Sequence, residues 1–359
     1  MAAAESAAAG DGATAYKPYL DGVRALSILV VAVAHGGLGD RVPGGLGVTV
    51  FFFVSGYLIT GLLLRERQRH GRIDLPAFYW RRFWRLVPAL AVYIAAAVAA
   101  TWALGAPVRP AEPLSALFYL TNYFGQFVGY GDAGTGHSPY SVLWSLAVEE
   151  HFYLLFAPLL ALLPGRTASR AAIGALLVLP LLVRAAVTHW AEPAFAADYT
   201  YHCTDTRIDS IAWGCLLAAW RPLAPGAARA RAAFAAGLAG LLLSLLLRDA
   251  YFRQVLRYSL QGASLYRVFL GLIHGAGLDG VRRLLSARPA VFVGRISYSL
   301  YLYHWLAIVL LMNLAGPIAL QPLWQAAYWT LAFAGACASY FLVERPTLRL
   351  RVRHGSVAR

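Results

Sequence analysis

Long apolar runs recur along almost the whole chain, and they restrict the fold more than any other feature of the sequence. Several come close to the about 20 residues that an α-helix needs to cross a hydrocarbon core of about 30 Å. The composition agrees, because 59% of the 359 residues are hydrophobic and only 13% are charged, which lies outside the range of soluble globular domains. We therefore predict an all-α, polytopic membrane protein.

We expect about ten transmembrane helices in one bundle. The predicted spans are 19–38, 46–64, 86–105, 142–163, 172–190, 208–223, 230–247, 264–278, 291–314 and 323–343. A further segment, 114–128, is short and polar at its end, so we expect a peripheral or re-entrant piece. Counting it as a span would place the arginines of the following loops outside the cell, against the positive-inside rule.

The basic residues, which give a net charge of +14, lie in short segments between the apolar runs. This distribution indicates charge that orients a membrane protein, not a surface for nucleic acid. The arginine-rich segment 65–85 is expected in the cytoplasm, and with it both termini, in a protein of the cell inner (plasma) membrane. Residues 1–18 are expected to form a disordered tail, 19–345 the transmembrane domain and 346–359 a basic tail. The three cysteines show no metal-ligand spacing, so we expect no metal.

The first predicted span contains RALSILVVAVAH, which begins on Arg24 and ends on His35. On a regular helix these two residues share one face and lie about 16 Å apart along the axis. Both cost free energy in hydrocarbon, which favours a functional role. A structural explanation stays open, in which Arg24 reaches the headgroups and His35 bonds to a neighbouring carbonyl.

A second polar cluster lies in SVLWSLAVEEHFYLLF, 141–156. Ser145, Glu149 and either Phe152 or Tyr153 share one helical face, whereas Glu150 points about 100° away from Glu149. We expect Glu149 to face a site and Glu150 a neighbouring helix. The structural alternative is a buried carboxylate that pairs with an arginine to join helices.

Two further polar groups belong to the predicted spans 291–314 and 208–223, the first inside its span and the second at the outer end of its span. Ser297, Tyr301 and His304 follow one another at i, i+4 and i+7, which predicts a polar stripe on an apolar helix. Arg207 and Asp209 could form a local ion pair or cap a helix.

Glu344 lies beside arginines at the inner end of the last span and could form a boundary salt bridge.

By depth in the membrane, the polar groups of the predicted spans form two predicted layers. The outer layer holds His35, Glu149, His304, Arg207 and Asp209, and the inner layer holds Arg24, Arg81, Arg82, Arg85, Glu344 and Arg345. Arginines suit a phosphate-bearing ligand from the cytoplasm, and a histidine near a carboxylate suits proton transfer. The residues alone predict a membrane enzyme or a proton-coupled transporter.

Seven motifs occur in the order typical of one protein family. They are LDGVRALSILVVAVAH, FFFVSGYLIT, RRFWRLVPAL, LWSLAVEEHFYLL, TDTRIDSIAWGCLLA, VGRISYSLYLYHW and VERPTLRL. With these motifs the chain resembles the membrane-bound acyltransferase 3 family of bacterial O-acyltransferases, from about Tyr19 to Arg349. The resemblance implies a ten-helix domain that moves an acyl group, often acetyl, from cytoplasmic acyl-CoA to a hydroxyl group.

The resemblance also implies roles for particular residues. Essential positions of the family fall on Arg24 and His35, and its other marked polar positions fall on Ser55, Arg82, Arg85, Trp144, Glu149, Tyr153, Arg207, Asp209, His304 and Glu344. We expect Arg24, Arg82, Arg85 and Glu344 to bind acyl-CoA, and His35, Glu149 and His304 to be catalytic, with a carboxylate orienting the His35 ring. Ser55, Trp144, Tyr153, Arg207 and Asp209 are expected to form an acceptor or structural polar site.

The expected partners are acyl-CoA as co-substrate, membrane lipid and a sugar or glycosylated acceptor, which would be a surface glycan or a secreted metabolite such as a macrolide. No cofactor is expected to stay bound, no nucleic acid is expected, and the sequence allows a homo-oligomer. The alternative function is a proton-coupled exporter of a lipid-linked glycan or small metabolite, with His35, Glu149 and His304 as a proton relay. Such exporters commonly have inverted halves with broken helices, and no such pairing is visible in the sequence.

Overall fold

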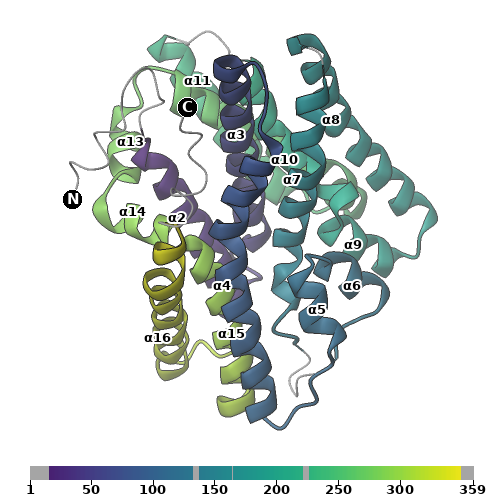
Figure 1. Cartoon of the computed structure of the whole chain (residues 1–359), viewed down its shortest axis with the longest axis vertical. Coiled ribbons are helices and arrows are strands. Elements are labelled where there is room, and N and C mark those ends of the chain that lie inside the picture. Colours follow the sequence, from purple (N-terminus) through teal and green to yellow (C-terminus); the bar gives the residue numbers. More distant parts are fainter. Residues whose placement is uncertain (1–15, 132–136, 164, 221–225, 349–359) are drawn as a thin grey trace.

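The computed structural model describes residues 16–131, 137–163, 165–220 and 226–348, and these residues form helices without a β-strand. Most of the two predicted tails, 1–15 and 349–359, lies outside this part of the chain. Figure 1 shows the long helices side by side in one bundle, with shorter helices packed at its flank. The predicted all-α bundle is confirmed.

The helices follow one another along the chain with short connections. They are α2 (Pro18–Val33), α3 (Gly44–His70), α4 (Leu75–Ala103), α5 (Ala111–Leu117), α6 (Thr121–Phe127), α7 (Trp144–Leu162), α8 (Gly165–Trp190), α9 (Pro193–His202), α10 (Thr204–Trp220), α11 (Ala227–Leu246), α12 (Arg257–Phe269), α13 (Asp279–Leu285), α14 (Arg288–Arg295), α15 (Ser297–Ala315) and α16 (Pro322–Ser339). Single π-helical turns extend α2 over Ala34–Leu38, α12 over Leu270–His274 and α16 over Tyr340–Glu344.

Eight helices in the described part of the chain are long and apolar enough to cross a membrane, so the protein is a multi-pass membrane protein. Two other predicted spans, 208–223 and 264–278, fall on α10 and α12. Helix α10 has 17 residues, fewer than the about 20 that a perpendicular crossing needs. Helix α12 is long enough together with the π-helical turns on both sides of it, over 252–274, but this segment contains Arg253, Arg257 and Arg267. The count of ten crossings therefore stays a prediction.

The doubtful segment 114–128 does not form one continuous helix. It is divided between α5 and α6, which have seven residues each and would each extend only about 10 Å. The expectation that this segment does not span the membrane by itself agrees with these lengths.

The arginine-rich segment 65–85 is mostly helical, which corrects its interpretation as a loop. Helix α3 continues to His70 and ends at Gly71, which has a φ of 71°, a conformation that glycine adopts without strain. Helix α4 then begins at Leu75, where Asp74 Oδ1 accepts a hydrogen bond of 2.9 Å from the Ala77 amide. Arginine is a good helix former whose long side chain can reach the polar boundary, so the basic residues extend the two helices.

Helix α10 is the centre of the packing, in contact with α3, α7, α8, α9 and α12. Glycines allow its close crossing with α3. A Cβ atom added to Gly56 would lie 2.0 Å from the Ile211 carbonyl oxygen, and one added to Gly214 would lie 2.0 Å from the Phe53 carbonyl oxygen. Small residues of this kind let the backbones of membrane helices approach, where lipid offers no hydrophobic drive between helices.

A valine at Gly214 should separate α3 from α10 and destabilise the protein by about 1–3 kcal/mol or more, because two backbones would be forced apart. The measurement is the thermal unfolding midpoint of the detergent-purified protein. Gly174→Val is the matched control, since Gly174 is also inside a long helix but nothing lies within 4 Å of an added Cβ there. Equal midpoints for the two variants would contradict the predicted role of the crossing.

Candidate functional site

A cavity of about 120 Å³ lies between α2, α3, α4, α7 and α15. Its charged and hydroxyl-bearing lining residues are Arg24, Ser55, Arg82, Arg85, Ser145, Glu149, Tyr153, Ser297, Tyr298 and Tyr301. The remaining walls are apolar side chains of α3, α4 and α7. The cavity thus places three arginines and one carboxylate inside a bundle of apolar helices, an arrangement that marks functional sites in membrane proteins.

The two neighbouring glutamates of α7 have different partners, as their angular separation predicts. Ser55 Oγ donates a hydrogen bond of 2.7 Å to Glu149 Oε1 inside the cavity. Arg82 Nη2 donates one of 3.1 Å to Glu150 Oε1, and the Arg82 guanidinium lies 3.4 Å from the centre of the Tyr153 ring. Glu150 therefore joins α7 to α4, while Glu149 faces the cavity.

A second cavity, of about 200 Å³, adjoins the first, because Arg24 and Leu58 line both. Lys17 and Arg65 are among its other lining residues, and Arg24 Nη1 lies 3.7 Å from Asp21 Oδ1 at its wall. Basic side chains therefore continue from the central cavity to the end of the bundle where α2 begins. Such a series of arginines and a lysine can bind a ligand that carries several phosphate groups.

His35 and His304 form a hydrogen-bonded pair, although 269 positions separate them in the chain. His35 Nδ1 lies 3.0 Å from His304 Nε2, and His304 Nδ1 lies 3.1 Å from the Leu300 carbonyl oxygen. A carbonyl oxygen only accepts, so the proton of a neutral His304 is on Nδ1, and its Nε2 must accept from His35 Nδ1. In this tautomer His35 Nε2 keeps a lone pair that can accept a proton or attack a carbonyl carbon.

His35 does not lie on a regular helix, which corrects the predicted geometry of the first span. The π-helical turn Ala34–Leu38 contains it, and Gly37 within the turn has a φ of 113°. The OH group of Tyr328 donates a hydrogen bond of 2.7 Å to the Ala32 carbonyl, and Gln325 Nε2 donates one of 2.7 Å to the Gly36 carbonyl. These two side chains of α16 hold the turn that aims His35.

The sequence analysis missed both Tyr328 and Gln325. The available signal was weak, because a tyrosine and a glutamine near the start of a span are also typical of interface anchors. Their hydrogen-bond partners are the backbone carbonyls of Gly36 and Ala32, in and before the π-helical turn. The spacing of apolar residues in the sequence does not reveal such a turn.

The polar stripe of α15 is confirmed as an inward-facing row. Ser297 and Tyr301 line the central cavity, and His304 is fully buried beyond them. The Tyr301 hydroxyl accepts a hydrogen bond of 2.7 Å from Ser145 and donates one of 2.6 Å to the Val142 carbonyl. Since the ring centres of Tyr301 and His304 are 5.6 Å apart, Tyr301 lies between the cavity and the histidine pair.

We expected Glu149 or another carboxylate to orient the His35 ring, and the described contacts give both residues other partners. The hydrogen-bond partner of Glu149 is Ser55, and the side-chain partner of His35 is His304. Glu149 also shares its cavity with Arg24, so Glu149 lies with the arginines of the predicted inner layer and not with His35 and His304. The charges of the loops predict how deep a residue lies in the membrane. They do not predict which neighbouring helix the residue faces.

Arg207 and Asp209 point in different directions, so the local ion pair, one of the explanations that the sequence left open, does not form. Residues two apart on a helix are about 200° apart around its axis. Arg207 Nη1 donates 2.7 Å to the Tyr201 carbonyl, Nη2 donates 3.2 Å to Thr49 Oγ1, and the guanidinium lies 3.9 Å from the Tyr258 ring centre. Trp144 packs on the same guanidinium at 5.4 Å.

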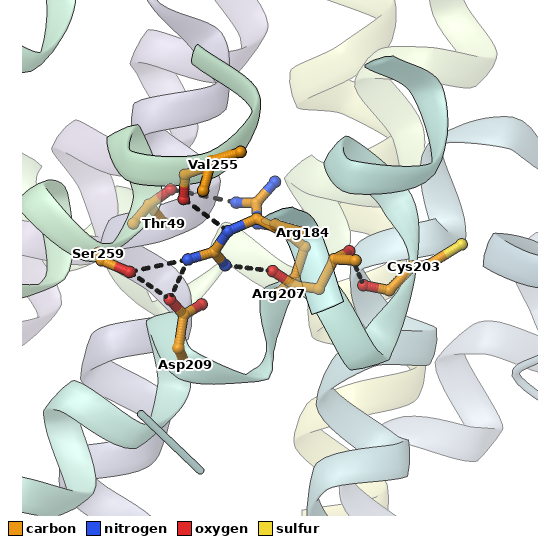
Figure 2. A network of polar contacts seen from close by, with 8 residues as sticks. Thr49, Arg184, Cys203, Arg207, Asp209, Val255 and Ser259 are labelled. Carbon is orange, nitrogen blue, oxygen red and sulfur yellow. Dashed lines mark hydrogen bonds and ion pairs between the residues drawn. The ribbon is translucent and has the colours of Figure 1, made fainter. Parts of the chain in front are cut away.

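Asp209 pairs with Arg184 of α8, at 2.8 Å between Nη2 and Oδ2, and both residues are 0% exposed. Figure 2 shows that Arg184 also donates to the Val255 carbonyl, while Ser259 donates to Asp209. Arg184 donates to the Thr206 carbonyl as well. This network connects α8, α10 and α12. Arg184 was missed in the sequence, although a lone arginine inside the apolar run 172–190 is a recognisable signal.

Glu344 lies in the π-helical turn after α16 and is buried. It accepts a hydrogen bond from Ser299 Oγ of α15, whose oxygen also lies 2.7 Å from Ser339 Oγ. Ser299 is thus the hydrogen-bond partner of Glu344 in the described part of the chain. The central cavity is lined by six of the predicted site residues, Arg24, Ser55, Arg82, Arg85, Glu149 and Tyr153. Its lining does not include Trp144, Arg207, Asp209 or Glu344.

Comparison with known proteins gives consistent results. The family model for the acyltransferase domain matches residues 17–343. The chain is 30% identical over 348 residues to the peptidoglycan O-acetyltransferase OatA of Listeria monocytogenes, covering 92% of this chain and 56% of that protein. It is 32% identical over 310 residues to the O-acetyltransferase OatA of Staphylococcus aureus, covering 82% of this chain and 51% of that protein.

The chain thus spans about half the length of these curated relatives. No solved structure gives a significant match. Because the family model covers most of the chain and includes Arg24, His35, Glu149 and His304, the chain belongs to the acyltransferase 3 family.

Proposed function

We propose that this protein is a membrane O-acyltransferase that moves an acyl group, most simply acetyl, from cytoplasmic acyl-CoA to a sugar hydroxyl of a cell-surface glycan. The histidine pair beyond an arginine-lined cavity is the observation that carries the proposal. Family membership and the names of the O-acetyltransferase relatives support the reaction class. The protein would act in the plasma membrane.

The donor would bind with its phosphates among the basic residues of the two adjoining cavities. Arg24 lines both cavities and is therefore suited to contact the part of the donor that crosses from one to the other. Arg82 and Arg85 would add charge-assisted hydrogen bonds deeper in the bundle, while Lys17 and Arg65 would face the outermost phosphate. The pantetheine arm would extend toward Tyr301 and the thioester toward His35.

His35 Nε2 would perform the chemistry. As a general base it would take the proton of the acceptor hydroxyl while that oxygen attacks the thioester carbonyl, and the CoA thiolate would leave. As a nucleophile it would form an acyl-imidazole first, which the acceptor hydroxyl would then attack. In both schemes His304 would hold the productive tautomer of His35 and stabilise the positive charge that develops on its ring.

The proposed acceptor is a glycan hydroxyl because the relatives are named as O-acetyltransferases, one of them of peptidoglycan. A hydroxyl of another glycosylated molecule would require the same base. Glu149 and Ser55, hydrogen-bonded to each other in the cavity, would orient the substrates at the arginine side.

His35→Ala should lower acyl transfer by about 10²- to 10⁴-fold, the usual contribution of a general base. His304→Ala should lower it by about 10- to 100-fold, since a hydrogen bond to a group that becomes charged is worth about 1.5–3 kcal/mol. The assay measures free CoA and acylated glycan together with purified protein, acetyl-CoA and peptidoglycan fragments. The exporter alternative predicts no CoA release from any variant.

His189→Ala is the control for both substitutions, because His189 is an exposed histidine at the end of α8. The proposed chemistry is refuted if folded His35→Ala protein forms product as fast as the control. Retained CoA release without glycan product in His304→Ala would instead place His304 on the acceptor side.

Arg24→Gln should raise the KM for acyl-CoA by about tenfold or more and leave kcat less affected, because it removes a charged contact to a donor phosphate. Arg41→Gln, an exposed arginine in the loop after the His35 turn, is the matched control and should leave KM unchanged. An unchanged KM in both variants would show that Arg24 does not bind the donor.

A further inference from the structure

A third basic pocket, separate from the two donor cavities, lies at the ends of α3, α8 and α10. It has a volume of about 280 Å³, and its lining contains Arg67, Arg166 and Arg170 but no acidic residue. Leu64, Ala219 and Trp220 form its apolar wall. None of these residues takes part in the proposed acyl transfer.

The three arginines are held differently. Arg67 Nη1 donates to the Leu160 and Leu163 carbonyls at 3.1 and 3.3 Å, and its Nη2 donates 3.2 Å to Ser169 Oγ. These bonds satisfy carbonyls at the C-terminal end of α7, where the helix leaves them without internal partners. Arg67 is therefore fixed in place, with a full positive charge beside the pocket.

Arg170 lies against the pocket wall, with its guanidinium 4.9 Å from the centre of the Trp220 ring. Its Nε atom is buried and makes no hydrogen bond to the residues that the structure describes. Arg166 is exposed in the first turn of α8, whose N-terminal amide groups and helix dipole add positive potential at the same place. The pocket therefore combines converging positive charge, an unused buried donor and no carboxylate in its lining.

The apolar wall of the pocket indicates which kind of anionic ligand it would bind. Trp220 is 42% exposed at the end of α10, as is typical of an aromatic side chain at the membrane interface. Leu162, which comes shortly before the pocket residue Gly165 in the chain, is 82% exposed. A phospholipid would bring its phosphate to the arginines and keep its acyl chains along this side of the bundle. Basic pockets between membrane helices bind anionic headgroups in this manner.

We propose that this pocket binds the phosphate of an anionic phospholipid. A phosphate diester would receive charge-assisted hydrogen bonds from Arg166 and Arg170, while Arg67 would contribute charge from its fixed position. The lipid would connect the ends of α3, α8 and α10 at a pocket that shares no lining residue with the two donor cavities.

The test is lipid binding by the full-length protein after purification in a neutral detergent. Cardiolipin, phosphatidylglycerol, phosphatidylcholine and inorganic phosphate are each titrated, and the thermal unfolding midpoint is recorded. We expect the two anionic lipids to raise the midpoint and the other two probes to leave it unchanged. Each arginine replaced should weaken the apparent lipid affinity by about fivefold, which corresponds to about 1 kcal/mol per basic residue near a membrane surface.

The variants are Arg166→Gln, Arg170→Gln and the double variant, and Arg229→Gln is the matched control as an exposed arginine in the first turn of α11. Arg166 is exposed, so its replacement should not change the midpoint without lipid. Equal lipid affinity in the double variant and the control overturns the proposal. An equal shift with inorganic phosphate alone shows a site for a soluble phosphate and overturns the assignment to lipid.

Discussion

Hydrocarbon offers no hydrogen bond, so the polar groups inside this bundle depend on partners within the protein. The pair of Arg184 and Asp209 illustrates the requirement, since both residues are fully buried and the arginine is also bonded to two backbone carbonyls and a serine. Breaking such a pair would leave a buried charge uncompensated. The helices around α10 are therefore joined by polar contacts as well as by the close approach of glycines.

The same requirement shapes the candidate site. A π-helical turn widens the end of the first helix, and Tyr328 and Gln325 of α16 bond to the carbonyls of Ala32 and Gly36 in and before that turn. The turn brings His35 to His304, whose own bond to a carbonyl selects the tautomer of both rings. Positioning of the proposed base thus depends on two helices, α15 and α16, that come near the end of the sequence.

The sequence predicted much of this arrangement from particular residues. The spacing of Ser297, Tyr301 and His304 correctly indicated an inward row, and the angle between Glu149 and Glu150 correctly separated a cavity residue from a helix-joining one. The sequence did not predict which helices pair with one another. Asp209 was assigned to a neighbour in sequence because its partner Arg184 lies 25 positions earlier on another helix.

Composition and periodicity by themselves determined that the chain forms apolar helices in a membrane, because hydrocarbon accepts only backbone that is bonded internally. The order of motifs also determined the family, which the comparisons confirmed. Only the tertiary structure decided which polar groups meet: Glu149 with Ser55, His35 with His304 and Asp209 with Arg184. Periodicity describes one helix at a time, whereas these contacts depend on how helices distant in sequence are rotated and packed against one another.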